Sequence, residues 1–186
     1  MEAAEFFGQI RIPATVAHVV AVVFGMGAAL VSDVLFSFFS KDKRLTRTEI
    51  SVLSVLARIV TISLVVIALS GVVIFFSDSA KYLASTKFMA KMSILGVLVI
   101  NGYVLHRYIW PHLLNKSFFF AKRERFARVT AFLCGAISVV SWLSVCVLGV
   151  LDGVPYAYGT IMALYVGILL VAMAVAVLIE QREFSS

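Results

Sequence analysis

Residues 51–76 read SVLSVLARIVTISLVVIALSGVVIFF, and Arg58 is the single ionisable side chain in this run. A helix that crosses the hydrocarbon core of a membrane needs roughly 20 predominantly apolar residues. A helix also satisfies its own backbone hydrogen bonds, which lipid cannot do for it. Residues 51–76 therefore predict a transmembrane helix.

Four further runs of the chain are apolar and of similar length, and the overall composition is also that of a membrane protein. Of the 186 residues, 62% are hydrophobic and 14% are charged, whereas soluble domains are roughly half apolar and a quarter charged. This composition excludes a soluble enzyme, a disordered tail and a disulfide-stapled secreted domain. We expect residues 1–186 to form one all-α domain, a bundle of five transmembrane helices, with spans at about 14–39, 51–76, 88–110, 128–151 and 155–179.

The basic residues indicate how the bundle is oriented. Most of the 16 lysines and arginines lie in the segments 41–47 and 107–128 or in the C-terminal tail. Cytoplasmic loops of membrane proteins carry an excess of lysine and arginine, so we expect the N-terminus outside and the C-terminus in the cytoplasm. The net charge of +6 then requires no nucleic-acid partner. The pattern favours a multi-pass protein of a bacterial-type inner membrane, with membrane lipids as partners.

Local signals predict where helices begin and how they meet. Thr46 and Thr48 precede the second span and are candidate N-caps, with Glu49 in the first turn of that helix. Small residues such as Gly25 and Gly27 recur in the spans. Because small side chains let helix backbones approach closely, we expect them at helix-packing positions.

The fourth span contains polar residues for which two interpretations stay open. Ser138, Ser141 and Ser144 either line a polar pocket or make hydrogen bonds between helices. Cys134 and Cys146 are about 18 Å apart along a helix, so they cannot form a disulfide with each other. We expect both cysteines to act as buried small hydrophobic residues.

Five ionisable residues fall inside the predicted spans: His18, Asp33, Arg58, Lys91 and His106. Such residues are costly in a membrane and usually face the interior of the bundle. Counting from the ends of the spans places His18 and Lys91 near the outer face and the other three in an inner layer. His18 and Asp33 have the same sequence separation as Lys91 and His106, and that separation corresponds to about 60° in azimuth and about 22 Å in height. The first and third spans can therefore each present polar groups to one interior at two levels.

The inner layer has a structural explanation. Asp33 and Arg58 can form an intramembrane ion pair, which would leave neither charge uncompensated. His106 is close to the membrane edge and is expected to be interfacial. Asn101 and His106 are kept as secondary polar candidates.

The outer layer allows both a structural and a functional interpretation. His18 can be a hydrogen-bonded core residue, and Lys91 can extend its ammonium group to the membrane surface. Alternatively, a neutral imidazole is an axial ligand for haem iron, and a neutral lysine amine carries a similar lone pair. The two residues can also form a proton relay, because histidine titrates near neutral pH.

Two stretches carry a resemblance to a known family. AHVVAVVFGMGAALVSDVLF (17–36) and KFMAKMSILGVLVINGYVLHRYI (87–109) resemble the first and third helices of the HemJ-type protoporphyrinogen oxidases and the related CopD-like membrane proteins. The resemblance implies b-type haem bound through His18 and Lys91. Asn101 and Gly102 stand where the family often has a histidine, so the resemblance extends to haem binding and not to that oxidation reaction.

These observations lead to one first hypothesis and two alternatives. The first is an integral membrane haem b redox protein, with His18 and Lys91 as axial ligands of the haem iron and with Arg58 or Lys87 near the haem propionates. The second is a non-catalytic bundle that serves as a subunit of a larger complex or as a lipid-binding scaffold. The third is a small proton-coupled transporter. The haem b hypothesis is compatible with a separate redox partner and with a homo-oligomer.

Overall fold

The computed structural model describes residues 2–41, 45–114, 125–151 and 155–184, with side chains from Phe6 onward. Within these residues the chain is helical and has no strands. Five helical segments are long and apolar enough to cross a membrane, which confirms the predicted all-α bundle of a multi-pass membrane protein. They are α2 (Arg11–Ser40), α3 (Arg47–Ser77), α5 (Thr86–Val104) with its continuation, α7 (Arg125–Val150) and α8 (Tyr158–Phe184).

Shorter helices extend or connect these segments. The helix α1 (Glu2–Gln9) precedes α2, and α4 (Ser79–Leu83) joins α3 to α5. The third spanning segment continues from α5 through a π-helical turn, η1 (Leu105–Ile109), into α6 (Trp110–Leu114). Most observed helices extend several residues beyond the predicted apolar spans, because helices continue into the interface where polar residues are tolerated. The last one begins at Tyr158, later than predicted.

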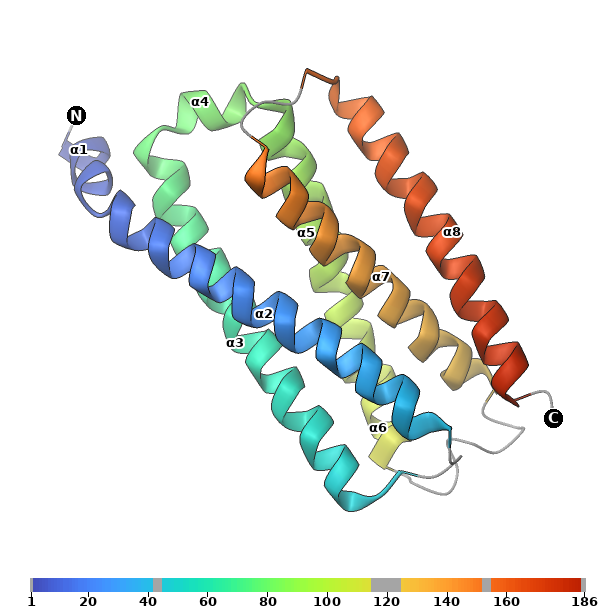
Figure 1. The fold of residues 1–186 in the computed structure, drawn as a ribbon. Coiled ribbons are helices and arrows are strands. Elements are labelled where there is room, and N and C mark those ends of the chain that lie inside the picture. Colours follow the sequence, from blue (N-terminus) through green and yellow to red (C-terminus); the bar gives the residue numbers. More distant parts are fainter. Residues whose placement is uncertain (1, 42–44, 115–124, 152–154, 185–186) are drawn as a thin grey trace.

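The five long helices form two groups (Figure 1). The first group is α2 packed along α3, and the second is α7 packed against both α5 and α8. The two groups meet mainly where α2 contacts α7. At this junction Trp142 of α7 is buried with Ala21, Ala29, Ile67 and Leu98 in one hydrophobic cluster.

A glycine makes the close approach at this junction possible. A Cβ atom on Gly25 would lie 2.8 Å from Cβ of Ser63 and 2.9 Å from Cη2 of Trp142. Real Cβ atoms do not come this close to other carbon atoms, so any larger residue would force α2 away from α3 and α7. The predicted packing role of Gly25 is confirmed, whereas a Cβ atom on Gly27 would have no atom within 4 Å.

The start of α3 confirms one of the two predicted N-caps. The Thr46 hydroxyl accepts a hydrogen bond from the Glu49 backbone N–H at 3.3 Å. In return, the Glu49 carboxylate accepts one from the Thr46 backbone N–H at 2.6 Å. This reciprocal arrangement is a capping box.

We expect Thr46→Ala to destabilise the protein by about 1 kcal/mol, because it removes the side-chain acceptor for an otherwise unpaired backbone donor. Thr48→Ala is the matched control, since Thr48 is exposed two residues later in the same turn and is not the cap. Thermal unfolding of both variants in detergent measures the difference. Equal melting temperatures for the two variants would contradict the assignment.

Some predictions concern residues that the structure does not describe or does not test. Residues 42–44, 115–124 and 152–154 lie outside the described ranges, and they include several of the cations behind the predicted orientation. The orientation of the termini relative to a membrane therefore stays a prediction.

Candidate functional site

His18, Ser70 and Lys91 form the outer polar group, and we call them the His18 site. His18 on α2 is half-buried, and its Nδ1 lies 3.0 Å from Oγ of Ser70 on α3. The imidazole ring stands over Gly71, where a Cβ atom would lie 3.7 Å from Cε1 of His18. The small residue next to Ser70 thus leaves space for the ring on the face of α3.

The hydrogen bonds around Ser70 indicate which nitrogen of His18 carries the proton. Oγ of Ser70 donates its one hydrogen to the Val66 carbonyl oxygen at 2.5 Å, with the Ile67 carbonyl oxygen at 3.2 Å. With that hydrogen directed to a backbone carbonyl oxygen, Oγ is left as an acceptor for His18, which favours the tautomer with the proton on Nδ1. Nε2 is then left with its lone pair, ready to bind a metal ion or accept a proton.

Lys91 approaches this histidine from the other helix group. It is half-buried on α5 and lies within electrostatic range of His18. Lys87, one helical turn earlier, donates from Nζ to the Leu151 carbonyl oxygen. The His18 site therefore combines an oriented imidazole on one group with an amine on the other.

Asp33 and Asn101 form an inner polar group against α7, and we call them the Asp33 site. Nδ2 of Asn101, which is 6% exposed, donates to the Cys134 carbonyl oxygen at 2.9 Å. Asp33 on α2 contacts Gly135, the residue that follows Cys134 on α7. A Cβ atom on Gly135 would lie 3.3 Å from Oδ1 of Asp33. Two buried oxygen atoms here, Oδ2 of Asp33 and Oδ1 of Asn101, accept no hydrogen bond.

The predicted ion pair between Asp33 and Arg58 is wrong. The Arg58 side chain is exposed, and the ion pairs of the described residues do not include these two. Arg58 lies nine residues before the buried Ile67, which at 100° per residue places it on the opposite side of α3. Counting residues from the end of a span gives the depth of a side chain in the membrane. It does not tell which side of the helix the side chain is on, so it could not show that Arg58 faces away.

Arg58 also fails to join the His18 site. It is twelve residues from Ser70 along α3, which corresponds to about 18 Å. Of the two residues predicted to lie near haem propionates, Lys87 is the one that the structure places beside the site.

His106 is not part of the inner group. Its side chain is exposed, and it belongs to the π-helical turn η1. A π-helical turn has more residues per turn than an α-helix, so it shifts the azimuth of the residues that follow. Exposure agrees with the interfacial role expected from the sequence.

An ion pair between α7 and α8 is a feature that the sequence patterns do not predict. Nε of Arg128 lies 3.3 Å from Oε1 of Glu180, and the Arg128 guanidinium is 4.9 Å from the centre of the Phe184 ring. Glu180 is 1% exposed and Arg128 4%. By sequence Arg128 belongs with the loop cations, and the acid at the end of the last apolar run is the signal that could have identified its partner.

The serine stretch of α7 makes a hydrogen bond between helices. Oγ of Ser141 lies 2.8 Å from the hydroxyl of Tyr165 on α8, and both groups are buried. This contact favours the packing interpretation of the stretch over the pocket interpretation. The cysteines are both free, with Cys134 buried and Cys146 half-buried.

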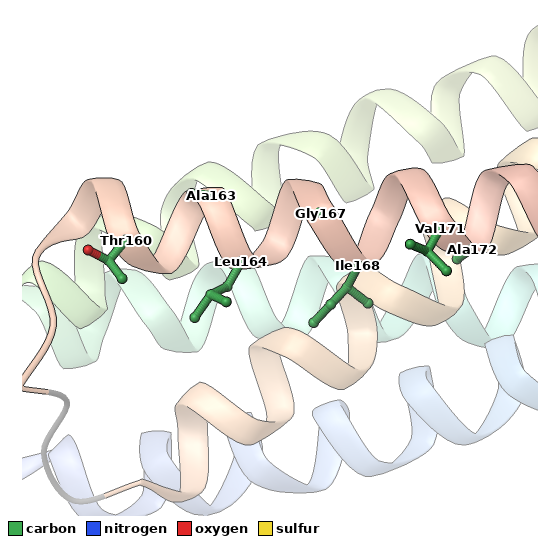
Figure 2. Close-up of a pocket in the computed structure, with 7 residues that line it drawn as sticks. All are labelled: Thr160, Ala163, Leu164, Gly167, Ile168, Val171 and Ala172. Atoms are coloured by element: carbon green, nitrogen blue, oxygen red, sulfur yellow. The ribbon is translucent and has the colours of Figure 1, made fainter.

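The hollow drawn in Figure 2 is separate from both polar groups. It runs along one exposed face of α8, and the side chains that line it are apolar apart from one threonine: Thr160, Ala163, Leu164, Gly167, Ile168, Val171 and Ala172. Because no ionisable side chain lines it, the hollow has no group for acid–base catalysis or for binding a metal ion. A surface of this composition suits contact with lipid chains.

No family model, curated protein or solved structure matches this chain. The resemblance to HemJ-type and CopD-like proteins therefore remains an expectation from the two quoted stretches. Within the described ranges, no three His, Cys, Asp or Glu side chains come together as a site for a protein-bound metal ion. The residues of the His18 site are therefore the basis for a proposed function.

Proposed function

We propose that the protein is an integral membrane redox protein that binds b-type haem near the outer face of the membrane. The observation that carries the proposal is the hydrogen bond from Nδ1 of His18 to Ser70, which leaves Nε2 with a free lone pair. Histidines that bind metals commonly donate their second ring N–H to a protein acceptor, which fixes the tautomer and the ring orientation. Ser70 is itself held by the Val66 carbonyl oxygen.

The residues present fit a haem. A porphyrin supplies four nitrogen ligands, so the protein needs to add only one or two axial ligands, and the lack of a three-ligand cluster within the described residues is compatible with that. His18 would hold the haem iron through Nε2, and Lys91 would hold it through its amine in the neutral form. Lys87, one turn before Lys91 on α5, would supply the cation for a propionate by exchanging its hydrogen bond to the Leu151 carbonyl oxygen.

The surroundings of the site suit this role. Bound haem would supply one-electron transfer, with a potential that depends on its axial ligands and their hydrogen bonds. The chain's own contribution is to orient the imidazole through Ser70 and to bring the amine from the second helix group. We propose a bacterial-type inner membrane as the location, with the basic segments on the cytoplasmic side facing anionic lipids and a separate redox partner exchanging electrons.

Absorption spectra test this proposal directly. We expect the protein, expressed with haem supply and purified in detergent, to show haem bands that sharpen and shift when dithionite is added. His18→Ala should lose most of the bound haem, and Lys91→Met should change the band positions, because each removes an axial lone pair. His106→Ala is the matched histidine control, since His106 is exposed, and it should retain the wild-type spectrum.

Ser70→Ala separates an orienting role from simple packing. We expect it to keep haem but to shift the reduction potential, because the hydrogen bond to Nδ1 tunes the basicity of the ligand. Absence of haem bands in the wild-type protein, or an unchanged spectrum in His18→Ala, would overturn the proposal. Those results would favour the alternative of a non-catalytic membrane bundle.

A further inference from the structure

The Asp33 site contains more hydrogen-bond acceptors than donors, although it is buried. Oδ2 of Asp33 and Oδ1 of Asn101 are both buried and both lack a donor. Their residues contact adjacent positions on α7, Asn101 at the Cys134 carbonyl and Asp33 at Gly135. Buried acceptors without partners cost several kcal/mol each in a lipid environment, by the order-of-magnitude estimate for unsatisfied groups.

No cation among the described residues neutralises Asp33. The ion pairs of those residues involve Glu180 and not Asp33, and Arg58 is turned away on α3. The titratable group that faces Asp33 from α7 is the Cys134 thiol, which supplies no positive charge. From α5 the site receives Asn101, which has no charge either.

A single proton resolves both deficits. When the Asp33 carboxylate takes up a proton from water, it becomes a neutral carboxyl group with one O–H donor. Oδ1 of Asn101, which also lacks a donor, belongs to a residue that contacts α7 one position before Asp33 does, and this makes it the candidate acceptor for that donor. Protonation thus removes the charge and gives the buried Oδ2 of Asp33 a hydrogen that it can donate to such an acceptor.

We propose that Asp33 and Asn101 form a proton-binding site inside the membrane, in which Asp33 holds the proton and Asn101 accepts its hydrogen bond. Intramembrane carboxyl groups without a counter-charge commonly mark proton relays. The site lies on α2 about 22 Å along the helix from His18, so it is distinct from the proposed haem ligands. It holds whether or not haem is bound.

Infrared spectroscopy of the full-length protein in lipid tests the proposal. We expect the absorption band of a protonated carboxyl group at neutral pH, its loss in Asp33→Asn, and its retention in Glu180→Gln. Asp33→Asn should remain folded, because its amide N–H can donate to Oδ1 of Asn101 as the carboxyl does. A band that persists in Asp33→Asn, or no such band over the pH range in which the protein stays folded, would overturn the proposal.

Chemical labelling provides a second readout with a control inside the same chain. An apolar carbodiimide reacts with protonated carboxyl groups in apolar surroundings, and mass spectrometry locates the product. We expect label on Asp33, decreasing as the pH rises, and little label on Glu180, which is 1% exposed and paired with Arg128. Preferential labelling of Glu180, or equal labelling of Asp33 and the exposed Asp78 by a water-soluble carbodiimide, would contradict the assignment.

Discussion

Arg128→Met is expected to lower the free energy of unfolding by about 3–5 kcal/mol, the usual cost of removing one partner of a buried ion pair. Glu180 is 1% exposed, and after the substitution the ion pair that remains to it among the described residues is the one with Arg125, at 3.9 Å. The carboxylate would then be buried without its close partner. The substitution also removes the guanidinium from the face of the Phe184 ring.

Replacing both partners distinguishes a pairing effect from a loss of packing. The double substitution Arg128→Met with Glu180→Met should recover most of the lost stability, because two apolar side chains of similar volume leave no buried charge. Arg125→Met is the control: the Arg125 side chain is 62% exposed, and exposed ion pairs contribute at most about 1 kcal/mol. Unfolding by denaturing detergent measures all three, and a double variant no more stable than Arg128→Met would contradict the explanation.

Gly25→Leu is expected to have a comparably large effect, through packing instead of charge. Its Cβ atom would collide with Cβ of Ser63 and with the Trp142 ring. Cβ of Ser63 is attached to the backbone of α3, and Trp142 is 3% exposed, so neither atom can move without shifting a helix. Overpacking a well-packed core costs about 1–3 kcal/mol and occasionally more. We expect the upper end of this range, because two helices must move.

Gly27→Leu is the matched control in the same helix. No atom lies within 4 Å of a Cβ on Gly27, and leucine is a better helix former than glycine by up to about 1 kcal/mol. Gly27→Leu should therefore be neutral or stabilising, while Gly25→Leu lowers the melting temperature in detergent. Similar losses for the two variants would show that the junction is less tightly packed than the structure indicates.

The five helices could be predicted from the sequence because local patterns determine them. An apolar run long enough to span a membrane can satisfy its backbone only as a helix, and the Thr46 capping box depends on residues three apart. The ends of the helices are less predictable, as the late start of α8 at Tyr158 illustrates. A helix end depends on contacts in the interface as well as on apolar content.

The polar sites were only partly predictable, because they depend on which way each helix faces. Equal depth led to the prediction that His18 and Lys91 act together, and the structure places the two within electrostatic range of each other. Depth alone paired Asp33 with Arg58, although Arg58 lies on the far side of α3 from the buried Ile67. Glu180 and Arg128 are far apart in sequence and come from helix ends that look like loop or tail residues, so the acid at the end of the last apolar run is the one sequence signal of their pairing.

The hydrogen bond between His18 and Ser70 has a consequence for biogenesis. The two residues belong to α2 and α3, which precede α5 in the chain, and these helices pack on each other along their length. Since segments of a chain fold in order of synthesis, this hairpin can set the imidazole tautomer while α5 is still being translated. Lys91 then arrives as the later addition, and insertion of the third spanning segment becomes the step that completes the His18 site.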